Sequence, residues 1–241
     1  MLVHGEPGVG KSWLAQTTPG PRLVLDAEGG SRRPMRMRNG KAERVKKVLW
    51  EPTRDSPPEV GDWETCLVQV RDFTTVRRVY EWLNSGRHPF HSVVMDSLTE
   101  IQKRCKDAIS GGETMSERAW GDLLLQMEQL VRQFRDLVFH PSNPLDAVVI
   151  LALTMAKNGG KSKPAVQGAL GTSMPGYVDV EGYLGAFPNP DTGEMERKLL
   201  IQPHQLFEAK DRTHILTAHY GPVIVNPDVV QMLDVLNKES E

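Results

Sequence analysis

GEPGVGKS, the run from Gly5 to Ser12, is the most informative part of the chain. It fits the pattern G-x-x-x-x-G-K-[ST] of a phosphate-binding loop. The apolar residues 1–4 predict a short strand before it, and residues 11–18 predict the start of a helix after it. Its glycines let the backbone curl so that consecutive N–H groups point at phosphate oxygens, and the dipole of the following helix favours the same anion. The run therefore predicts a site for the phosphates of a nucleotide.

We expect the loop and the first helical residues to contact the nucleotide together. Lys11 is expected to reach the β- and γ-phosphates, and the Ser12 hydroxyl to hold Mg²⁺. The alternative is a glycine-rich turn that carries an ordinary surface lysine, but the strand before it and the helix after it favour the site. The predicted nucleotide-binding residues are Gly5, Glu6, Pro7, Gly8, Val9, Gly10, Lys11, Ser12 and Trp13.

The composition indicates a soluble globular protein without a global affinity for polyanions. The chain has 241 residues, 39% of them hydrophobic and 25% charged, and its net charge is −2. Any nucleic acid would therefore have to bind local basic patches. Cys66 and Cys105 are too far apart to form a metal-ligand pair, and low cysteine content fits a reducing cytoplasm. We expect no signal peptide, because the phosphate loop stands in its place, and the apolar run 147–153 is too short to cross a membrane.

Strands and helices are expected to alternate through residue 155. Apolar runs predict strands over 23–25, 65–73, 91–97 and 146–156, and helical spacing predicts helices over 74–86, 97–110 and 116–139. This order predicts an α/β fold with a mainly parallel sheet flanked by helices, in a single domain over residues 1–241.

The remaining segments predict a hairpin, a last helix and several loops. Residues 182–187 and 196–202 predict an antiparallel hairpin at one edge of the sheet. Asn226 is expected to cap the last helix, with Pro227 in its first turn. Residues 31–47 carry eight Lys or Arg and one Glu without a clear period, so we interpret them as a solvated loop in preference to a phosphate-tracking patch.

Asp96 ends the apolar strand of residues 93–95. An acid at this point can accept hydrogen bonds from the hydration shell of Mg²⁺ opposite Ser12, which is the Walker B role. The alternative is an N-cap for the helix that follows. Many P-loop ATPases carry a Glu directly after this Asp to orient the attacking water, but here the position is Ser97.

Glu28 offers the missing carboxylate from a different strand end. It follows the strand over 23–25, at the edge where open α/β sheets bind ligands. A carboxylate there can polarise a water in line with the γ-phosphate. Glu100, one helical turn beyond Asp96, is the weaker candidate, and Asp26 is interpreted as structural.

These motifs together resemble the RecA-like recombinase ATPases. The resemblance rests on GEPGVGKS, on LVLDAEGG over 23–30, on VVMDS over 93–97 and on the strand that ends in LALT at 154. It implies a RecA-like P-loop NTPase core that uses ATP and Mg²⁺, with Glu28 as the catalytic glutamate and Thr154 as the residue that senses the γ-phosphate. RecA has a glutamine near the position of Thr154.

The chain is most similar to the phage-encoded RecA-like ATPases of the Sak annealing group, a likeness that covers most of its length and includes Trp120-Gly121, Asp179 and AKDR over 209–212. It implies a DNA-binding loop after residue 156, with Lys157, Lys161 and Lys163 on the backbone of single-stranded DNA. No aromatic residue precedes Tyr177 in that loop, so base stacking by the loop itself is not expected.

The resemblance also implies an oligomer, a ring or a filament, with ATP between subunits. Lys210 and Arg212 form a K-x-R pair similar to one that ring helicases use across subunits to touch a neighbour's γ-phosphate. The alternative is an exposed charged turn. Because the chain begins four residues before the phosphate loop, we expect the subunits to be held by something other than an N-terminal arm.

Three functions remain open from the sequence. The first is an oligomeric ATPase that binds single-stranded DNA, assists annealing or recombination, works in the cytoplasm of a host cell and has a single-strand binding protein as a further partner. The second is a nucleotide-switched binding protein, such as a helicase loader, with little turnover. The third is a small-molecule kinase, which leaves Glu28 and its flanking glycines without a role.

Overall fold

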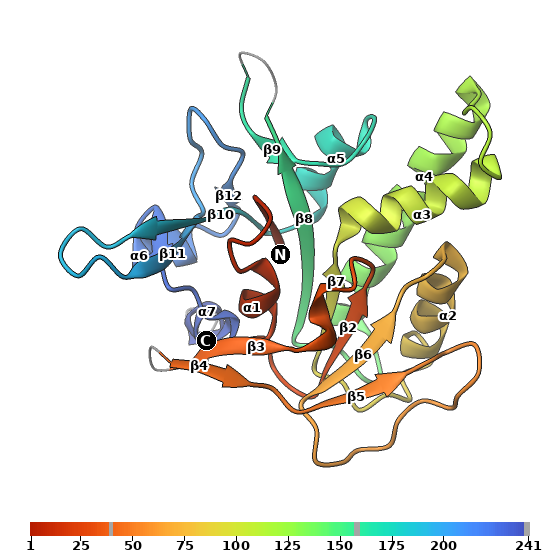
Figure 1. Ribbon diagram of the computed structural model, residues 1–241, viewed down its shortest axis with the longest axis horizontal. Helices are drawn as coiled ribbons and strands as arrows, with labels where there is room; N and C mark the ends of the chain where they lie inside the picture. The colour runs from red at the N-terminus through yellow and green to blue at the C-terminus, as the bar shows by residue number, and fades with distance from the viewer. Residues whose placement is uncertain (39–40, 157–159, 239–241) are drawn as a thin grey trace.

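A central, mainly parallel sheet organises the computed structural model, which describes residues 1–38, 41–156 and 160–238 (Figure 1). Its strand order is β13-β11-β10-β1-β8-β7-β2-β6-β5. The strands from β10 to β5 run parallel to their neighbours. They are β10 (Val180–Pro188), β1 (Leu2–Gly5), β8 (Ala147–Met155), β7 (Ser92–Asp96), β2 (Arg22–Asp26), β6 (Thr65–Gln69) and β5 (Lys47–Trp50).

Antiparallel strands extend one edge, as the sequence predicts. β11 (Met195–Leu200) pairs with β10, and β13 (Val223–Val225) pairs with β11. Two short strands lie off this path, namely β12 (Lys210–Asp211) beside β10 and β9 (Lys163–Pro164) beside β8. The predicted fold class, a mainly parallel α/β sheet with an antiparallel hairpin at one edge, is confirmed.

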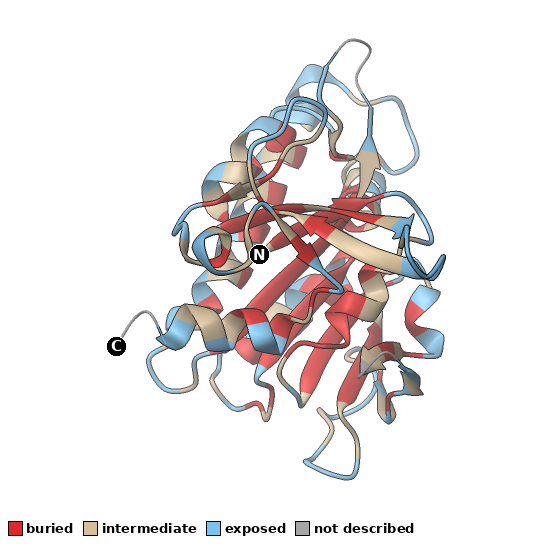
Figure 2. Ribbon diagram, turned by 90° about the vertical axis from the view of Figure 1, so that its left-hand side faces the viewer, coloured by how far each residue is buried: buried red, intermediate tan, exposed pale blue. Residues whose placement is uncertain are grey.

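Helices cover both faces of the sheet, and the buried strands lie between the two layers (Figure 2). One face packs against α1 (Lys11–Ala15), α6 (Ile215–Tyr220) and α7 (Val229–Lys238). The other packs against α2 (Phe73–Leu83), α3 (Leu98–Ser110), α4 (Glu117–Asp136) and α5 (Leu170–Tyr177). Every residue of β1, β2 and β7 is buried, as expected for parallel strands covered on both faces. No helix in the described ranges is long and apolar enough to cross a membrane.

Three predictions about local structure are wrong. Residues 31–47 contain the hairpin β3 (Met35–Arg38) and β4 (Lys41–Arg44), paired antiparallel, where we expected a loop. The loop expected over 157–176 contains all but the last residue of α5, whose Pro175 and glycines weaken the helical signal in the sequence. Asn226 is not a helix cap: its φ is 47°, and its side chain accepts a hydrogen bond from the Arg197 N–H at 3.1 Å.

Asp228 caps the last helix instead. Its side chain accepts a hydrogen bond from the Gln231 N–H at 3.1 Å, which satisfies one of the free donors of the first turn. Pro227 therefore precedes α7, which begins at Val229.

Phe134 provides a test of the packing between α4 and the sheet. Its side chain is fully buried, and its ring lies 5.5 Å from that of Tyr80 of α2. We expect Phe134→Ala to lower the free energy of unfolding by about 3–5 kcal/mol, because the cavity cannot fully collapse. Leu125→Ala on the same helix is the control: Leu125 is 60% exposed, and its loss should cost no more than about 0.5 kcal/mol. Urea unfolding measures both, and equal values would contradict the packing.

Candidate nucleotide site

The phosphate-binding loop connects β1 to α1 at the carboxyl end of the parallel strands. Gly8 and Gly10 have φ angles of 82° and 101°, which side-chain-bearing residues rarely adopt. A Cβ at Gly10 would also lie 2.1 Å from Nε of Arg197, so a larger residue there would displace that side chain. The loop is therefore folded as its motif predicts, and β11 approaches it closely.

Lys11 lies under the loop. Its side chain is buried, and Nζ donates hydrogen bonds to the carbonyls of Gly5 at 2.8 Å and Glu6 at 2.9 Å. Burial lowers the pKa of Lys11, while the carboxylates of Glu28 and Asp96 oppose that shift. These contacts place a cation at the loop where the end of a phosphate chain would lie.

Ser12 and Asp96 face each other across the start of α1. The Ser12 hydroxyl donates to Oδ2 of Asp96 at 2.7 Å, and the Ser31 hydroxyl donates to the same oxygen at 3.1 Å. Burial raises the pKa of Asp96 to about 6, an effect that the Ser12 hydrogen bond opposes and the nearby Glu28 and Asp26 carboxylates increase. The predicted metal-binding pair is thus assembled from two segments 84 residues apart in sequence.

Both oxygens suit Mg²⁺, a hard cation that commonly takes one or two protein oxygens and completes its shell with water and phosphate. The described residues contain no group of three or more His, Cys, Asp or Glu side chains that could hold a metal ion. Ser12 and Asp96 therefore fit a metal ion that arrives with a nucleotide better than one held by the protein alone.

Glu28 stands beside this pair. Its side chain is exposed, and the Ser97 hydroxyl donates a hydrogen bond to its Oε1. β2 and β7 are neighbours, with Asp26 opposite Asp96, so the residues after the two strands meet. Asp26 accepts hydrogen bonds from the N–H groups of Gly29 at 2.7 Å and Ser31 at 3.1 Å, which fixes the turn that carries Glu28 and fits its structural interpretation.

Glu100, the weaker candidate, is engaged with its own helix. Its carboxylate pairs with Lys103 at 3.0 Å and Arg104 at 3.2 Å. The structure thus brings Glu28 together with Ser97, and Glu100 with two cations of α3.

Ser97 positions Glu28 and also caps α3, where its hydroxyl accepts a hydrogen bond from the Glu100 N–H at 3.4 Å. We expect Ser97→Ala to lower the rate of ATP hydrolysis by about tenfold, because Glu28 loses the hydroxyl that holds its carboxylate, and to cost about 1 kcal/mol of stability. Ser116→Ala, which removes the cap of α4, is the matched control. It should lose similar stability at an unchanged rate. Equal rates for the two variants would contradict the positioning role.

Thr154 lies at the end of β8, with its side chain bound on the far face of the sheet. Its Oγ1 is 3.0 Å from Nδ1 of His4 and donates to the Lys163 carbonyl at 3.3 Å. Side chains alternate along a strand, so Thr154 lies on the same face as Ala152, which packs with α2–α5. Leu151 lies on the other face, which packs with α1. Burial lowers the pKa of His4 to about 4, so the ring is neutral at pH 7. The structure does not bring Thr154 together with Lys11 and Glu28.

The predicted DNA-binding lysines fall on the segment after β8. Lys161 is exposed and Lys163 is half-buried in β9, whereas Lys157 lies outside the described residues. The Ser162 N–H donates to the Leu206 carbonyl at 2.7 Å, which brings the segment over 203–208 beside these lysines.

That neighbouring segment supplies aromatic rings that the sequence prediction missed. Phe207 stacks on Tyr183 at 3.8 Å between ring centroids, and exposed His204 stacks on Phe207 at 5.5 Å. Phe207 lies 46 positions after Lys161, so no local pattern could have linked them.

Lys210 and Arg212 bind the end of α5. Lys210 donates to the carbonyl of Pro175, and Arg212 donates to the carbonyl of Gly176 at 2.6 Å and to Asp179 at 3.0 Å. Burial lowers the pKa of Lys210, as does the charge of Arg212. Both cations therefore stabilise the carboxyl end of α5 in this subunit. β12 pairs with the first residues of β10, so Lys210 and Arg212 lie near the amino ends of the parallel strands, whereas the phosphate loop lies at their carboxyl ends.

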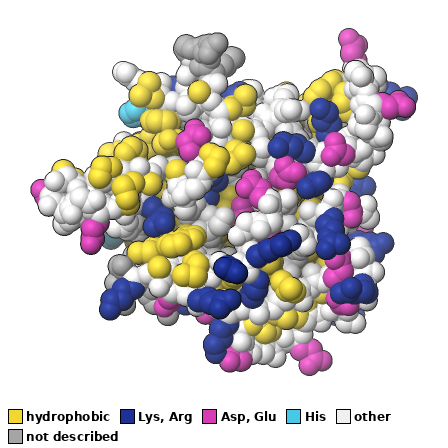
Figure 3. All heavy atoms as spheres, viewed as in Figure 1, with side chains coloured by type: hydrophobic (Ala, Val, Ile, Leu, Met, Phe, Trp, Pro, Cys, Tyr) yellow, Lys and Arg dark blue, Asp and Glu magenta, His cyan; other side chains and the backbone are white. Residues whose placement is uncertain are grey.

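Basic side chains of the stretch 31–47 gather over β3 and β4 (Figure 3). Arg36 is bound to Glu43 and, at 2.5 Å, to Glu64, and Lys46 pairs with Asp62 at 2.6 Å. Burial and the charges of Arg44 and Arg32 lower the pKa of Lys47. The stretch is thus a basic hairpin with partial internal neutralisation.

Solved structures with a similar fold come from several kinds of ATPase and accessory protein. An ATPase of the type III secretion system of pathogenic bacteria has 14% identity and a TM-score of 0.45 over 76% of this chain, which spans 51% of that protein. Flagellar accessory protein FlaH from Methanocaldococcus jannaschii has 9% identity and a TM-score of 0.42, over 93% of this chain and 82% of that one. A KaiC-like protein from Pyrococcus horikoshii OT3 has 13% identity and a TM-score of 0.41, over 94% and 88%. These similarities are too low to assign an activity.

No curated protein is similar to the chain at a significant level. The model of one protein family, described as an AAA domain, matches residues 1–213 of the 241. That range contains the phosphate loop, Glu28, Asp96 and the K-x-R pair. The chain therefore belongs to the AAA domain family of P-loop ATPases.

Proposed function

We propose that this protein binds ATP with Mg²⁺ and hydrolyses it, acting on single-stranded DNA as an oligomer. The observation that carries the ATPase part is the assembly of Lys11, Ser12 and Asp96 around one loop, with Glu28 held beside them by Ser97. These are the groups that bind a phosphate chain, hold its metal ion and orient a water.

Each side chain has a distinct role in this proposal. Lys11 and the loop N–H groups bind the β- and γ-phosphates, and Ser12 and Asp96 hold Mg²⁺. When bound, Mg²⁺ neutralises charge on the phosphate oxygens. Glu28 accepts a proton from the attacking water, and its exposure leaves solvent access to the γ-phosphate side. Thr154 senses the γ-phosphate through its contact with His4, which shares β1 with the loop.

The DNA part rests on the resemblance to the phage annealing ATPases and on the segment after β8. Lys161 and Lys163 would contact the phosphate backbone, and His204 with Phe207 offers rings for base stacking. We expect Lys161→Ala with Lys163→Ala to weaken binding of a labelled oligonucleotide and to reduce its salt dependence. Lys103→Ala, which removes an exposed lysine of α3, serves as the control and should bind as the parent does.

Two measurements test the whole proposal: the ATPase rate with and without single-stranded DNA, and negative-stain images of the assembly. A rate that rises with DNA in a ring or filament supports it. A monomer whose rate does not respond to DNA would overturn the DNA and oligomer parts, and the ATPase part would stand or fall on the rate alone.

Mixed oligomers test whether Lys210 and Arg212 act on the neighbouring subunit. To do so, both side chains would have to leave α5 and contact the neighbour's nucleotide. Lys11→Ala and Arg212→Ala subunits should each be inactive, and mixing them should restore activity, since some interfaces then pair an intact loop with an intact Arg212. No recovery on mixing contradicts the trans role and leaves both residues with their structural role at α5.

The alternative is a nucleotide-switched binding protein, such as a helicase loader. It predicts that the parent already holds ATP without measurable turnover. A filter-binding assay that follows bound γ-labelled ATP over time separates the two, because an ATPase releases labelled phosphate and a switch does not.

A further inference from the structure

Arg197 of β11 is a cation at the phosphate loop that the roles above leave unused. Its guanidinium lies over the ring of Trp13, with Cζ 4.6 Å from the ring centroid, and its Nε lies 2.1 Å from the position that a Cβ of Gly10 would take. Nε is buried and has no hydrogen-bond partner among the described residues. A buried donor without a partner is costly, so it calls for an explanation, and a bound anion is one.

Two hydrogen bonds fix the backbone of β11 at Arg197. The Arg197 N–H donates to the side chain of Asn226 at 3.1 Å, and the Arg197 carbonyl accepts from the Asn226 N–H at 2.6 Å. Leu199, two residues along, packs in the core beside α1, so alternation along β11 points Arg197 toward α1 as well. Burial lowers the pKa of Arg197, in keeping with a charge that has no counter-ion nearby.

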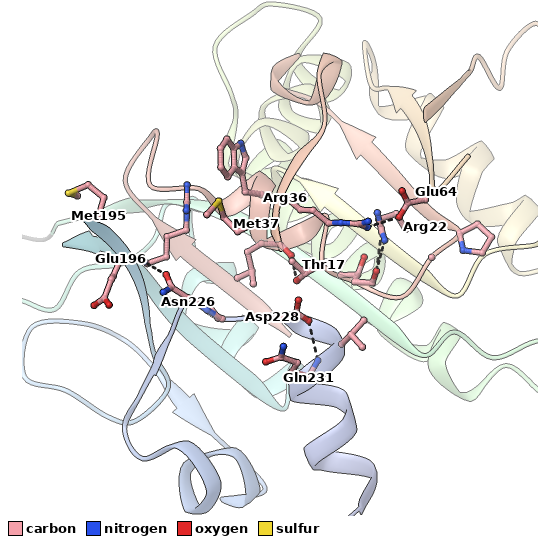
Figure 4. A pocket seen from close by; sticks show the side chains of 18 of the residues that line it. Thr17, Arg22, Arg36, Met37, Glu64, Met195, Glu196, Asn226, Asp228 and Gln231 are labelled. Atoms are coloured by element: carbon pink, nitrogen blue, oxygen red, sulfur yellow. Dashed lines mark hydrogen bonds and ion pairs between the residues drawn. The ribbon is translucent and has the colours of Figure 1, made fainter. Parts of the chain in front are cut away.

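A cavity of about 750 Å³ begins at Trp13 and Arg197. It runs along α1 between the β3–β4 hairpin, β11 and the start of α7 (Figure 4). Arg36 and Glu64 lie at one end, Met195 and Glu196 at the other, and Asp228 and Gln231 line the side of α7. Its volume is within the range of sites that enclose a small ligand.

The two sides of the loop are unlike. Ser12 turns toward Asp96 and Glu28, where the metal ion and the water belong. Gly10 and Trp13 face Arg197 and the cavity. A phosphate chain whose terminal end lies at the acidic side must continue to its nucleoside on the other side.

We propose that Arg197 binds the α-phosphate of the nucleotide and that Trp13 forms the wall of the cavity in which its base lies. This inference rests on the proposed nucleotide site. The guanidinium can donate two parallel hydrogen bonds to phosphate oxygens, and the indole offers a flat apolar surface to a base. In this arrangement the guanidinium gains an anionic partner.

Equilibrium binding of Mg²⁺ with ATP, ADP and inorganic tripolyphosphate tests the assignment. Arg197→Ala should weaken all three by about tenfold or more, because each places a phosphate group beside Arg197. Trp13→Ala should weaken ATP and ADP by about tenfold and leave tripolyphosphate unchanged, since only the nucleotides carry a base. Lys198→Ala is the matched control: it removes the next cation of β11, which pairs with Glu196 at 3.6 Å, and should bind all three as the parent does.

The outcomes separate this inference from the proposed function. If the parent binds neither ATP nor tripolyphosphate, or if Lys11→Ala binds both as the parent does, the nucleotide site itself is wrong. If Lys11→Ala loses binding while Arg197→Ala and Trp13→Ala keep parent affinities, only the present inference is overturned. Thermal unfolding of each variant identifies any that fail to fold, and Arg197→Lys, which keeps the charge without the planar fork, should then show an intermediate affinity.

Discussion

Lys11→Ala is expected to lower the rate of ATP hydrolysis by about 10²–10³-fold, the loss typical of removing one charge-stabilising donor from a preorganised site. Lys11 is only 7% exposed, and its Nζ lies within 2.9 Å of two carbonyls of the loop. Alanine therefore removes the cation at the β- and γ-phosphates and also the hydrogen bonds that brace the loop. ATP binding should weaken as well, because the same charge acts in the ground state.

Steady-state phosphate release with purified protein measures the rate, and isothermal titration measures the affinity. Lys103→Ala removes a lysine whose side chain is 58% exposed and should leave both values unchanged. Hydrolysis by Lys11→Ala at the parent rate would show that the chemistry takes place elsewhere in the chain.

Glu28→Gln is expected to stop hydrolysis while keeping ATP bound. The amide preserves the size of the side chain but cannot take a proton from water, so the rate should fall by about 10²–10⁴-fold. Affinity for ATP should change little, because the Glu28 side chain contacts Ser97 and solvent and not the phosphate loop. The variant should therefore accumulate unhydrolysed ATP, detectable by chromatography of the denatured complex.

Glu100→Gln is the matched control for Glu28. Glu100 follows Asp96 by one helical turn, but its carboxylate is paired with Lys103 and Arg104. We expect the parent rate from Glu100→Gln. A large loss from Glu100→Gln together with a normal rate from Glu28→Gln would reverse the two assignments.

Local motifs carried the prediction of the nucleotide site from the sequence. The phosphate loop is contiguous, so its residues and its strand–loop–helix context could be identified together. Asp96 followed from the rule that buried parallel strands end at one edge, and the structure places its carboxylate 2.7 Å from the Ser12 hydroxyl. The β3–β4 hairpin was missed because the apolar–charged alternation of Met35–Arg38 covers only four residues of a highly basic stretch, and α5 was missed because Gly and Pro lower its helix propensity.

Arg197 shows what a sequence cannot convey by pattern. It is one of the many basic residues of the chain, and nothing near it in sequence suggests a ligand. Its position follows from the register of β11, from the two hydrogen bonds to Asn226 and from the bare backbone of Gly10. Asn226 lies 29 positions from Arg197 in the sequence, and Gly10 lies 187 positions from it.

The position of β1 in the sheet bears on when the protein acquires its function during synthesis. β1 is made first, but its two neighbours are β8 and β10, which end at residues 155 and 188. Closing loops of this length is entropically costly, and pairing across them is slow. A ribosome-bound chain that ends before β8 thus contains the complete phosphate-binding motif with no strand to support it. Nucleotide binding is therefore expected only after β8 and β10 have been made.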